Sequence, residues 1–182
     1  MAQSIYGVES IIFDTPVAGA FPTFKTTGEG ATGFMLDKIV TDSFTFNDSA
    51  PSTNDINIEE INEPYEILNS DNGTKSFTFQ IYNMDETMYQ KLMGYADADS
   101  EGFYAEDPEA EVTKEFAVQV TTKPLNKHKA RVIQYARMRV NITRSGNLAK
   151  SGLLSFNLEC TRLANIAEDG TVKTGKKWKY VE

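Results

Sequence analysis

The sequence predicts a mainly β protein, an antiparallel β-sandwich or partly closed barrel with one short α-helix packed at its flank. Several segments alternate apolar and polar residues, the pattern of half-buried strands. Only one short stretch has the apolar spacing and end signals of a helix. Gly- and Asn-containing turns separate the strand segments, as in antiparallel sheets. With 182 residues, of which 40% are hydrophobic, the chain is expected to form a single domain over residues 1–182.

The first third of the chain has the least regular pattern. Residues 1–30 are rich in Gly, Ala, Thr and Pro, so we expect an extended N-terminal arm with a short strand at Ile11–Phe13. Gly33–Phe46 is the next strand candidate, a long one whose alternation slips in the middle.

Two acidic segments are expected to be loops or insertions. Residues 47–73 contain seven acids and no Lys or Arg, and residues 97–111 again contain seven acids and no base. Asn72-Gly73 predicts a hairpin turn, because both residue types tolerate positive φ. Neither segment has the spacing of an EF-hand, so the acids predict no calcium site.

The helical stretch follows the clearest strand, Ser76–Tyr82, which places Phe77, Phe79 and Ile81 on one face. Asp85 is positioned to cap the helix by accepting from the backbone N–H of Thr87 or Met88. Gly94 is positioned to end it in the left-handed conformation. The apolar stripe consists of Met84, Met88, Tyr89, Leu92 and Met93. A helix this short is unstable alone, so we expect it to pack against the sheet.

The last part of the chain reads as a series of strands. One strand places Phe116, Val118 and Val120 on one face, and another places Leu154, Phe156, Leu158 and Cys160 on one face. Between them, strict alternation in the segment 131–143 predicts an apolar face and a polar face. The predicted apolar face is Val132, Ala136, Met138, Val140 and Ile142, and the predicted polar face is Arg131, Arg137, Arg139, Asn141 and Thr143. Asp169-Gly170 predicts a final turn.

The net charge of −8 is unevenly distributed. Residues 1–111 carry 21 acidic and 4 basic side chains, whereas residues 112–182 carry 5 acidic and 14 basic ones. Either both halves solvate different faces of one domain, or the acidic part of one copy meets the basic part of another. The negative total argues against a protein that chiefly binds nucleic acid.

No catalytic, metal or cofactor site is predicted. His128, the only histidine, lies between lysines in an expected loop, and Cys160 lies on an apolar strand face as a small buried residue. One cysteine allows no intrachain disulfide, and a thiol-reducing compartment is the simpler interpretation. The sequence predicts neither a signal peptide nor a membrane span.

The order of elements resembles the major tail tube proteins of long-tailed bacteriophages. The passage "SFTFQIYNMDETMYQKLMGYA" is followed by "KEFAVQVTTKP" and by "ARVIQYARMRVNITRSGNLAKSGLLSFNLEC". In that family, which is related to the tubes of contractile tails and of type VI secretion, a strand runs into "DETxxxLxG" and a later strand pair follows. The resemblance covers residues 33–163 and rests on architecture and pattern.

This resemblance implies a structural protein without catalytic residues. Its copies would form hexameric rings that stack into a tube around a lumen for genome passage, located in the virion tail and made in the host cytoplasm. Expected partners are further copies of the chain, a tape-measure protein and tail-terminator or initiator proteins, with DNA passing unbound and no membrane. Assembly or lumen candidates are Asp48, Asp55, Glu59, Glu60, Glu63, Lys127, Lys129, Arg131, Arg137 and Arg139.

Two alternatives remain open at this point. One is a carbohydrate- or protein-binding β-sandwich on a virion or cell surface, with an exposed aromatic cluster from Phe103, Tyr104 or Trp178. The other is the inner-tube subunit of a contractile injection system. An enzyme is disfavoured because the sequence lacks an acid–base constellation.

Overall fold

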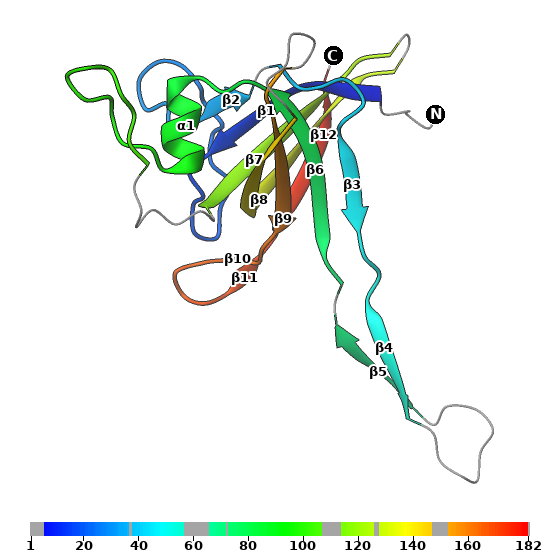
Figure 1. Cartoon of the computed structure of the whole chain (residues 1–182). Coiled ribbons are helices and arrows are strands. Elements are labelled where there is room, and N and C mark those ends of the chain that lie inside the picture. The colour runs from blue at the N-terminus through cyan, green and yellow to red at the C-terminus, as the bar shows by residue number, and fades with distance from the viewer. Residues whose placement is uncertain are drawn as a thin grey trace.

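A computed structural model describes residues 6–36, 38–56, 66–71, 73–106, 114–125, 128–146 and 153–181. The protein is mainly β with one helix, as predicted (Figure 1). The elements are β1 (Tyr6–Asp14), β2 (Phe34–Leu36), β3 (Thr45–Asp48), β4 (Ser52–Ile56), β5 (Glu66–Asp71), β6 (Lys75–Tyr82), α1 (Glu86–Met93), β7 (Lys114–Lys123), β8 (Ala130–Ser145), β9 (Ser155–Arg162), β10 (Asn165–Ile166), β11 (Val172–Lys173) and β12 (Lys176–Val181).

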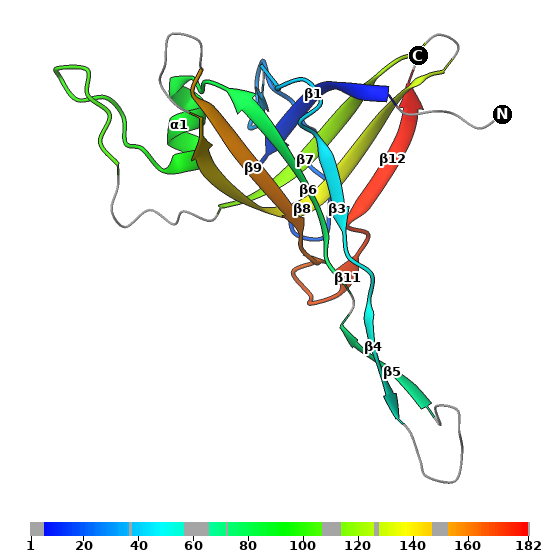
Figure 2. The ribbon, with the colours of Figure 1, turned by 45° about the vertical axis from the view of Figure 1, so that its right-hand side comes forward.

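One antiparallel sheet of eight strands forms the body, in the order β2-β1-β7-β8-β9-β6-β3 with β12 also pairing with β8. The long strand β8 is the branch point of this sheet. Along one side, β8 pairs with β7. Along its other side, the first part of β8 pairs with β12 and the second part pairs with β9. The sheet therefore divides into two curved halves, and β3 does not pair with β2 or β12 to close a barrel (Figure 2).

The core lies between these two halves. Its largest fully buried side chains include Phe13 of β1, Phe77 and Phe79 of β6, and Phe156 of β9. The ring of Phe77 lies 5.5 Å from that of Tyr135 in β8, so β6 and β8 contact each other through the core. The sandwich-like arrangement follows, because each half buries only one of its faces.

Helix α1 has the ends that the sequence predicts. The Asp85 carboxylate accepts from the Met88 backbone N–H at 2.8 Å, and Gly94 ends the helix with φ 75°. Met88 and Leu92 are buried in the common core, and Tyr89 packs edge-on against Phe156 of β9. The prediction of a short helix packed at the flank of the sheet is therefore confirmed.

The beginning of the chain differs from the expected arm. Residues 6–14 form β1, a strand inside the main sheet between β2 and β7, with Ile11 and Phe13 fully buried. Loop residues follow from 15 to 33, and the Asp14 carboxylate anchors them by accepting from the backbone N–H of Phe24 and the hydroxyl of Thr32. The Gly-, Ala-, Thr- and Pro-rich composition of residues 1–30 therefore did not indicate that residues 6–14 form a buried strand.

The expected long strand at Gly33–Phe46 is also interrupted. It consists of β2 and the start of β3, joined by a segment in which Lys38 and Asp42 have positive φ. Positive φ takes the backbone out of the β region, so the strand cannot continue through these residues.

Strands β4 and β5 form a separate hairpin that extends away from the body (Figure 2). Because β3 pairs with β6 and β4 pairs with β5, the segments 45–56 and 66–82 are the two sides of one long hairpin. The predicted turn at Asn72-Gly73 is wrong, since Gly73 lies between β5 and β6, which do not pair. A Cβ on Gly73 would lie 2.5 Å from the Ser49 carbonyl oxygen, so this glycine permits a close approach of the two sides.

Strand β8 contains an irregularity that strict alternation did not predict. Val118 pairs with Tyr135 but Phe116 pairs with Met138, so β8 gains one residue against β7. The bulge reverses the side-chain direction along the strand. Arg131 therefore lies on the opposite face from Arg137 and Arg139, and the predicted single arginine face is wrong.

Candidate assembly surfaces and a tyrosine-lined pocket

The long hairpin carries part of the predicted acidic assembly segment. Asp48 is exposed at the end of β3, where it forms a 3.5 Å ion pair with Lys75 on the opposite strand. Asp55 is exposed in β4, like every other side chain of that strand. Glu59, Glu60 and Glu63 lie outside the described residues. The described part of the segment is thus a paired projection in which the side chains of β3 and β4, including Asp48 and Asp55, are exposed.

Arg137 and Arg139 lie on the sheet face that points away from the core. The Arg137 Nε donates to the Glu115 carboxylate at 2.6 Å, and Arg139 is the direct cross-strand neighbour of Glu115. The carboxylate lowers the positive charge of this face within one copy. Sequence reasoning missed Glu115, although its pairing follows once the register of β7 on β8 is known.

Arg131 lies near the edge strand β12. Its guanidinium group lies 3.9 Å from the ring centre of Trp178 and 5.9 Å from that of Tyr180, both on the neighbouring β12. These distances are those of cation–π contacts. Lys129 is exposed just before β8, and Lys127 lies outside the described residues.

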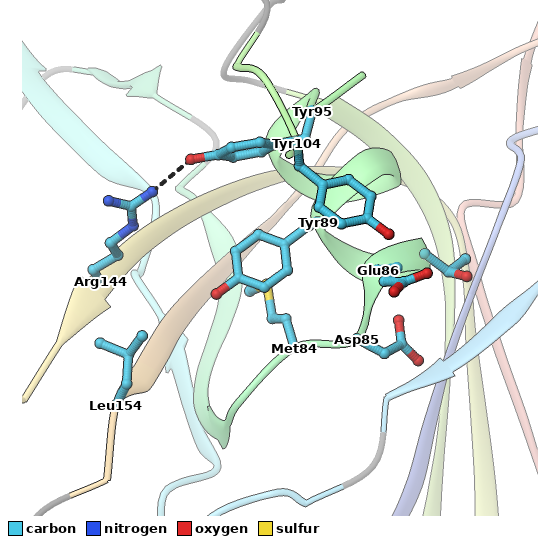
Figure 3. A pocket seen from close by; sticks show the side chains of 9 residues that line it. Met84, Asp85, Glu86, Tyr89, Tyr95, Tyr104, Arg144 and Leu154 are labelled. Atoms are coloured by element: carbon cyan, nitrogen blue, oxygen red, sulfur yellow. Dashed lines mark hydrogen bonds between the residues drawn. The ribbon is translucent and has the colours of Figure 1, made fainter. Parts of the chain in front are cut away.

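A pocket of about 890 Å³ lies beside the start of helix α1. Tyr89 of the helix, Tyr95 and Tyr104 of the following loop, and Arg144 and Leu154 at the ends of β8 and β9 line it (Figure 3). The ring centres of Tyr89 and Tyr95 are 5.6 Å apart in an edge-to-face arrangement. Arg144 donates to the Tyr95 hydroxyl at 2.9 Å. Two strand ends, a helix and a loop thus build one concave aromatic site.

The pocket has two ends of opposite charge. Asp85 and Glu86 lie at the helix end, and Arg144 lies at the strand end (Figure 3). A hydrogen bond to Glu86 is the main cause that raises the pKa of Tyr104 above its usual value, followed by burial and the negative charges of Glu86 and Asp97. Acids outnumber the single arginine, so the pocket favours a cation.

The described residues hold no group of His, Cys, Asp and Glu side chains that could hold a metal ion. Cys160 is fully buried, and burial raises the pKa of its thiol well above the usual value, which confirms the prediction of a buried core residue. His128 lies half-buried in a turn, where it bridges to Leu125. Among the described helices, none is long and apolar enough to cross a membrane.

The aromatic residues suggested for a surface-binding protein do not gather at one place. Phe103 and Tyr104 lie in the loop beside α1, whereas Trp178 lies on β12 at another side of the body (Figures 1 and 2). Tyrosines 89, 95 and 104 instead meet at the pocket. Only Tyr89 was assigned a structural role from the sequence, and no local pattern joins it to the other two.

Comparison with protein-family models and with curated proteins found no match for this chain.

Proposed function

We propose that the chain is a structural, self-assembling subunit of a phage tail tube, which forms stacked, hexameric rings around a lumen for genome passage. The observation that carries the proposal is the projecting hairpin β4–β5. An isolated two-stranded hairpin is at best marginally stable in water. A partner surface would stabilise it, and a subunit in the next ring is the partner that a tube supplies.

Open sheet edges support the same proposal. Among the described strands, β2, β3 and β12 each pair along one side only. Unpaired edges favour contacts between chains, and a ring of identical copies uses them without leaving free ends. The uneven distribution of charge along the sequence further favours contacts between unlike surfaces.

The polar face of β6, β9 and β8 is suited to line the lumen. It presents the amide and hydroxyl groups of Ser76, Thr78, Gln80, Asn141, Thr143, Asn157 and Thr161, together with the charged side chains of Glu159 and Arg139. Amide and hydroxyl groups give DNA phosphates no cationic binding sites, and Glu115 counters the two arginines of this face by pairing with Arg137 and lying directly opposite Arg139. The proposal assigns the chain no catalytic role, and its partners are further copies, a tape-measure protein and terminator or initiator proteins of a tail.

Electron microscopy of the concentrated protein tests this proposal. We expect rings and tubes in the micrographs. In size-exclusion chromatography, the assembled fraction should rise with protein concentration. A strictly monomeric protein at all concentrations, even with a tail initiator protein, would contradict it and would favour a surface-binding β-sandwich. The inner tube of a contractile injection system would give similar rings, and a sheath protein that polymerises around them would identify it.

A further inference from the structure

We propose that the tyrosine-lined pocket beside α1 receives the ammonium group of Lys179 from a neighbouring copy of the chain. The inference rests on the proposed function, because it requires copies placed side by side in a ring. It adds a specific lateral contact to that function: an aromatic and acidic pocket on one copy, and a lysine of the edge strand β12 on the next.

The chemistry of the pocket selects a cation. The rings of Tyr89, Tyr95 and Tyr104 surround the space, and their faces carry the negative side of the aromatic quadrupole (Figure 3). The carboxylates of Asp85 and Glu86 lie at the helix end of the same space. An ammonium group there would gain cation–π contacts and one or two charged hydrogen bonds together.

Arg144 does not fill this position. Its guanidinium group lies at the opposite end of the pocket from Glu86, where it is bound to the Tyr95 hydroxyl at 2.9 Å (Figure 3). Asp85 accepts from the Met88 N–H and Glu86 accepts from the Tyr104 hydroxyl. Within the described part of the chain neither carboxylate forms an ion pair, so the acidic end can take a second cation. Arg144 also limits how far a lysine can enter, since like charges repel.

The lysines of β12 differ in whether they already contact a ring. The ammonium group of Lys176 lies 5.4 Å from the ring centre of Tyr135, and that of Lys177 lies 4.2 Å from the ring centre of Phe21. Lys179 is exposed on the same strand, and among the described residues no ring contact of this kind holds it. It is thus the lysine of β12 best placed to bind elsewhere.

The two surfaces lie on different sides of the same body. Helix α1 and β12 are well separated in both views, so Lys179 does not reach the pocket of its own copy (Figures 1 and 2). A contact between two different surfaces of identical copies is heterologous, and repeated rotation closes such contacts into a ring. The pocket and Lys179 therefore fit the head-to-tail geometry that a ring needs.

A double-mutant cycle tests this contact. Glu86→Gln removes the carboxylate charge, and Lys179→Met removes the ammonium while keeping the side-chain length. We expect each change to raise the protein concentration needed for half-maximal ring formation by about tenfold. Both changes remove the same contact, so their effects should not add. The double variant should therefore need about the same protein concentration as the single variant that assembles less readily. Light scattering and size-exclusion chromatography across concentration give these values.

A matched control uses exposed residues outside the pocket. Glu101→Gln and Lys173→Met make the same charge changes and should leave ring formation within about twofold of the unchanged protein. If Glu86→Gln perturbs folding in circular dichroism, Tyr104→Leu replaces it in the cycle. If rings form but the two effects add, the double variant needs about a hundredfold higher protein concentration for half-maximal ring formation. That result overturns the pocket contact and leaves the tube proposal standing. A protein that forms no rings overturns both.

Discussion

The sandwich body and the projecting hairpin β4–β5 are built from the same kind of strand but are stabilised in different ways. In the body, β6 and β9 bury phenylalanine side chains on one face and carry mostly half-buried polar ones on the other. In the hairpin, every side chain of β4 is exposed. The same backbone pairing therefore carries a buried hydrophobic face in the body and only exposed side chains along β4 of the hairpin.

Under the proposed function, this difference places folding stability in the body and assembly contacts in the hairpin. Burial of apolar surface is the main favourable term in folding, so the body is expected to fold without the hairpin. Where the two regions meet, polar pairs replace the aromatic ones: Ser49 and Thr74 form a hydrogen bond at 3.0 Å between their hydroxyls, and Asp48 pairs with Lys75. Exposed pairs of this kind add little stability.

The largest effect is expected from the aromatic core of the body. Phe77 is 1% exposed and contacts the rings of Phe44, Phe79 and Tyr135. Phe77→Ala should lower the free energy of unfolding by about 3–5 kcal/mol, through lost burial and the cavity that remains. Its cross-strand neighbour Phe46 is 49% exposed, so Phe46→Ala should cost only about 1 kcal/mol. Urea unfolding measures both, and equal losses would contradict the decline in burial from β6 to the edge strand β3, which leads into the hairpin.

A second effect should appear only at high pH, and it comes from Tyr135 in the body. Burial, together with the negative charge of Asp48, raises the pKa of Tyr135 to about 12. The unfolded chain ionises this hydroxyl near pH 10, so it binds fewer protons than the folded state above that pH. Stability from this group is complete below about pH 10 and is lost as the pH rises toward 12, by up to about 2–3 kcal/mol.

The variant Tyr135→Phe isolates this contribution. It should remove the part of the alkaline loss that comes from Tyr135 while leaving the part from Cys160, whose pKa burial raises in both proteins. Thermal unfolding at pH 8 and at pH 11 gives the comparison. A difference between the two proteins that is the same at both pH values would show that Tyr135 does not titrate abnormally.

The same division explains how much of the structure the sequence predicts. Helix α1 and strand β6 are predicted with their ends and buried faces, because a capping carboxylate, a terminal glycine and alternating phenylalanines act locally. The chain order of strand, helix and strand series is likewise local. These elements all belong to the body, where each residue pattern reports directly on burial.

Features that depend on a distant strand were predicted less well. The bulge in β8 is defined only by its register against β7, so the shared face of Arg131 and Arg137 was predicted incorrectly. Gly73 was interpreted as a turn because its positive φ does not reveal which strand approaches it. The tyrosine pocket depends on where the loop after α1 returns, through the bridge between Tyr95 and Glu106, and no short pattern encodes that return.

The smallest effect on the fold should come from removing the hairpin. Ser49 and Thr74 already lie opposite each other, since the Ser49 N–H donates to the Thr74 carbonyl at 2.9 Å. Replacing residues 50–73 by Asn-Gly gives a two-residue loop of the type that closes antiparallel strands. We expect the free energy of unfolding to change by less than about 0.5 kcal/mol, because the deleted strand β4 buries none of its side chains.

The shortened protein also separates lateral from axial assembly under the proposed function. Rings should still form at an unchanged protein concentration, because the sheet edges and the tyrosine pocket remain, whereas stacks of rings in electron micrographs should disappear. Loss of several kcal/mol of stability would show that the hairpin belongs to the folding unit of the body. Tubes of normal length would show that the hairpin makes no contact between rings, which would remove the main support for its role in stacking.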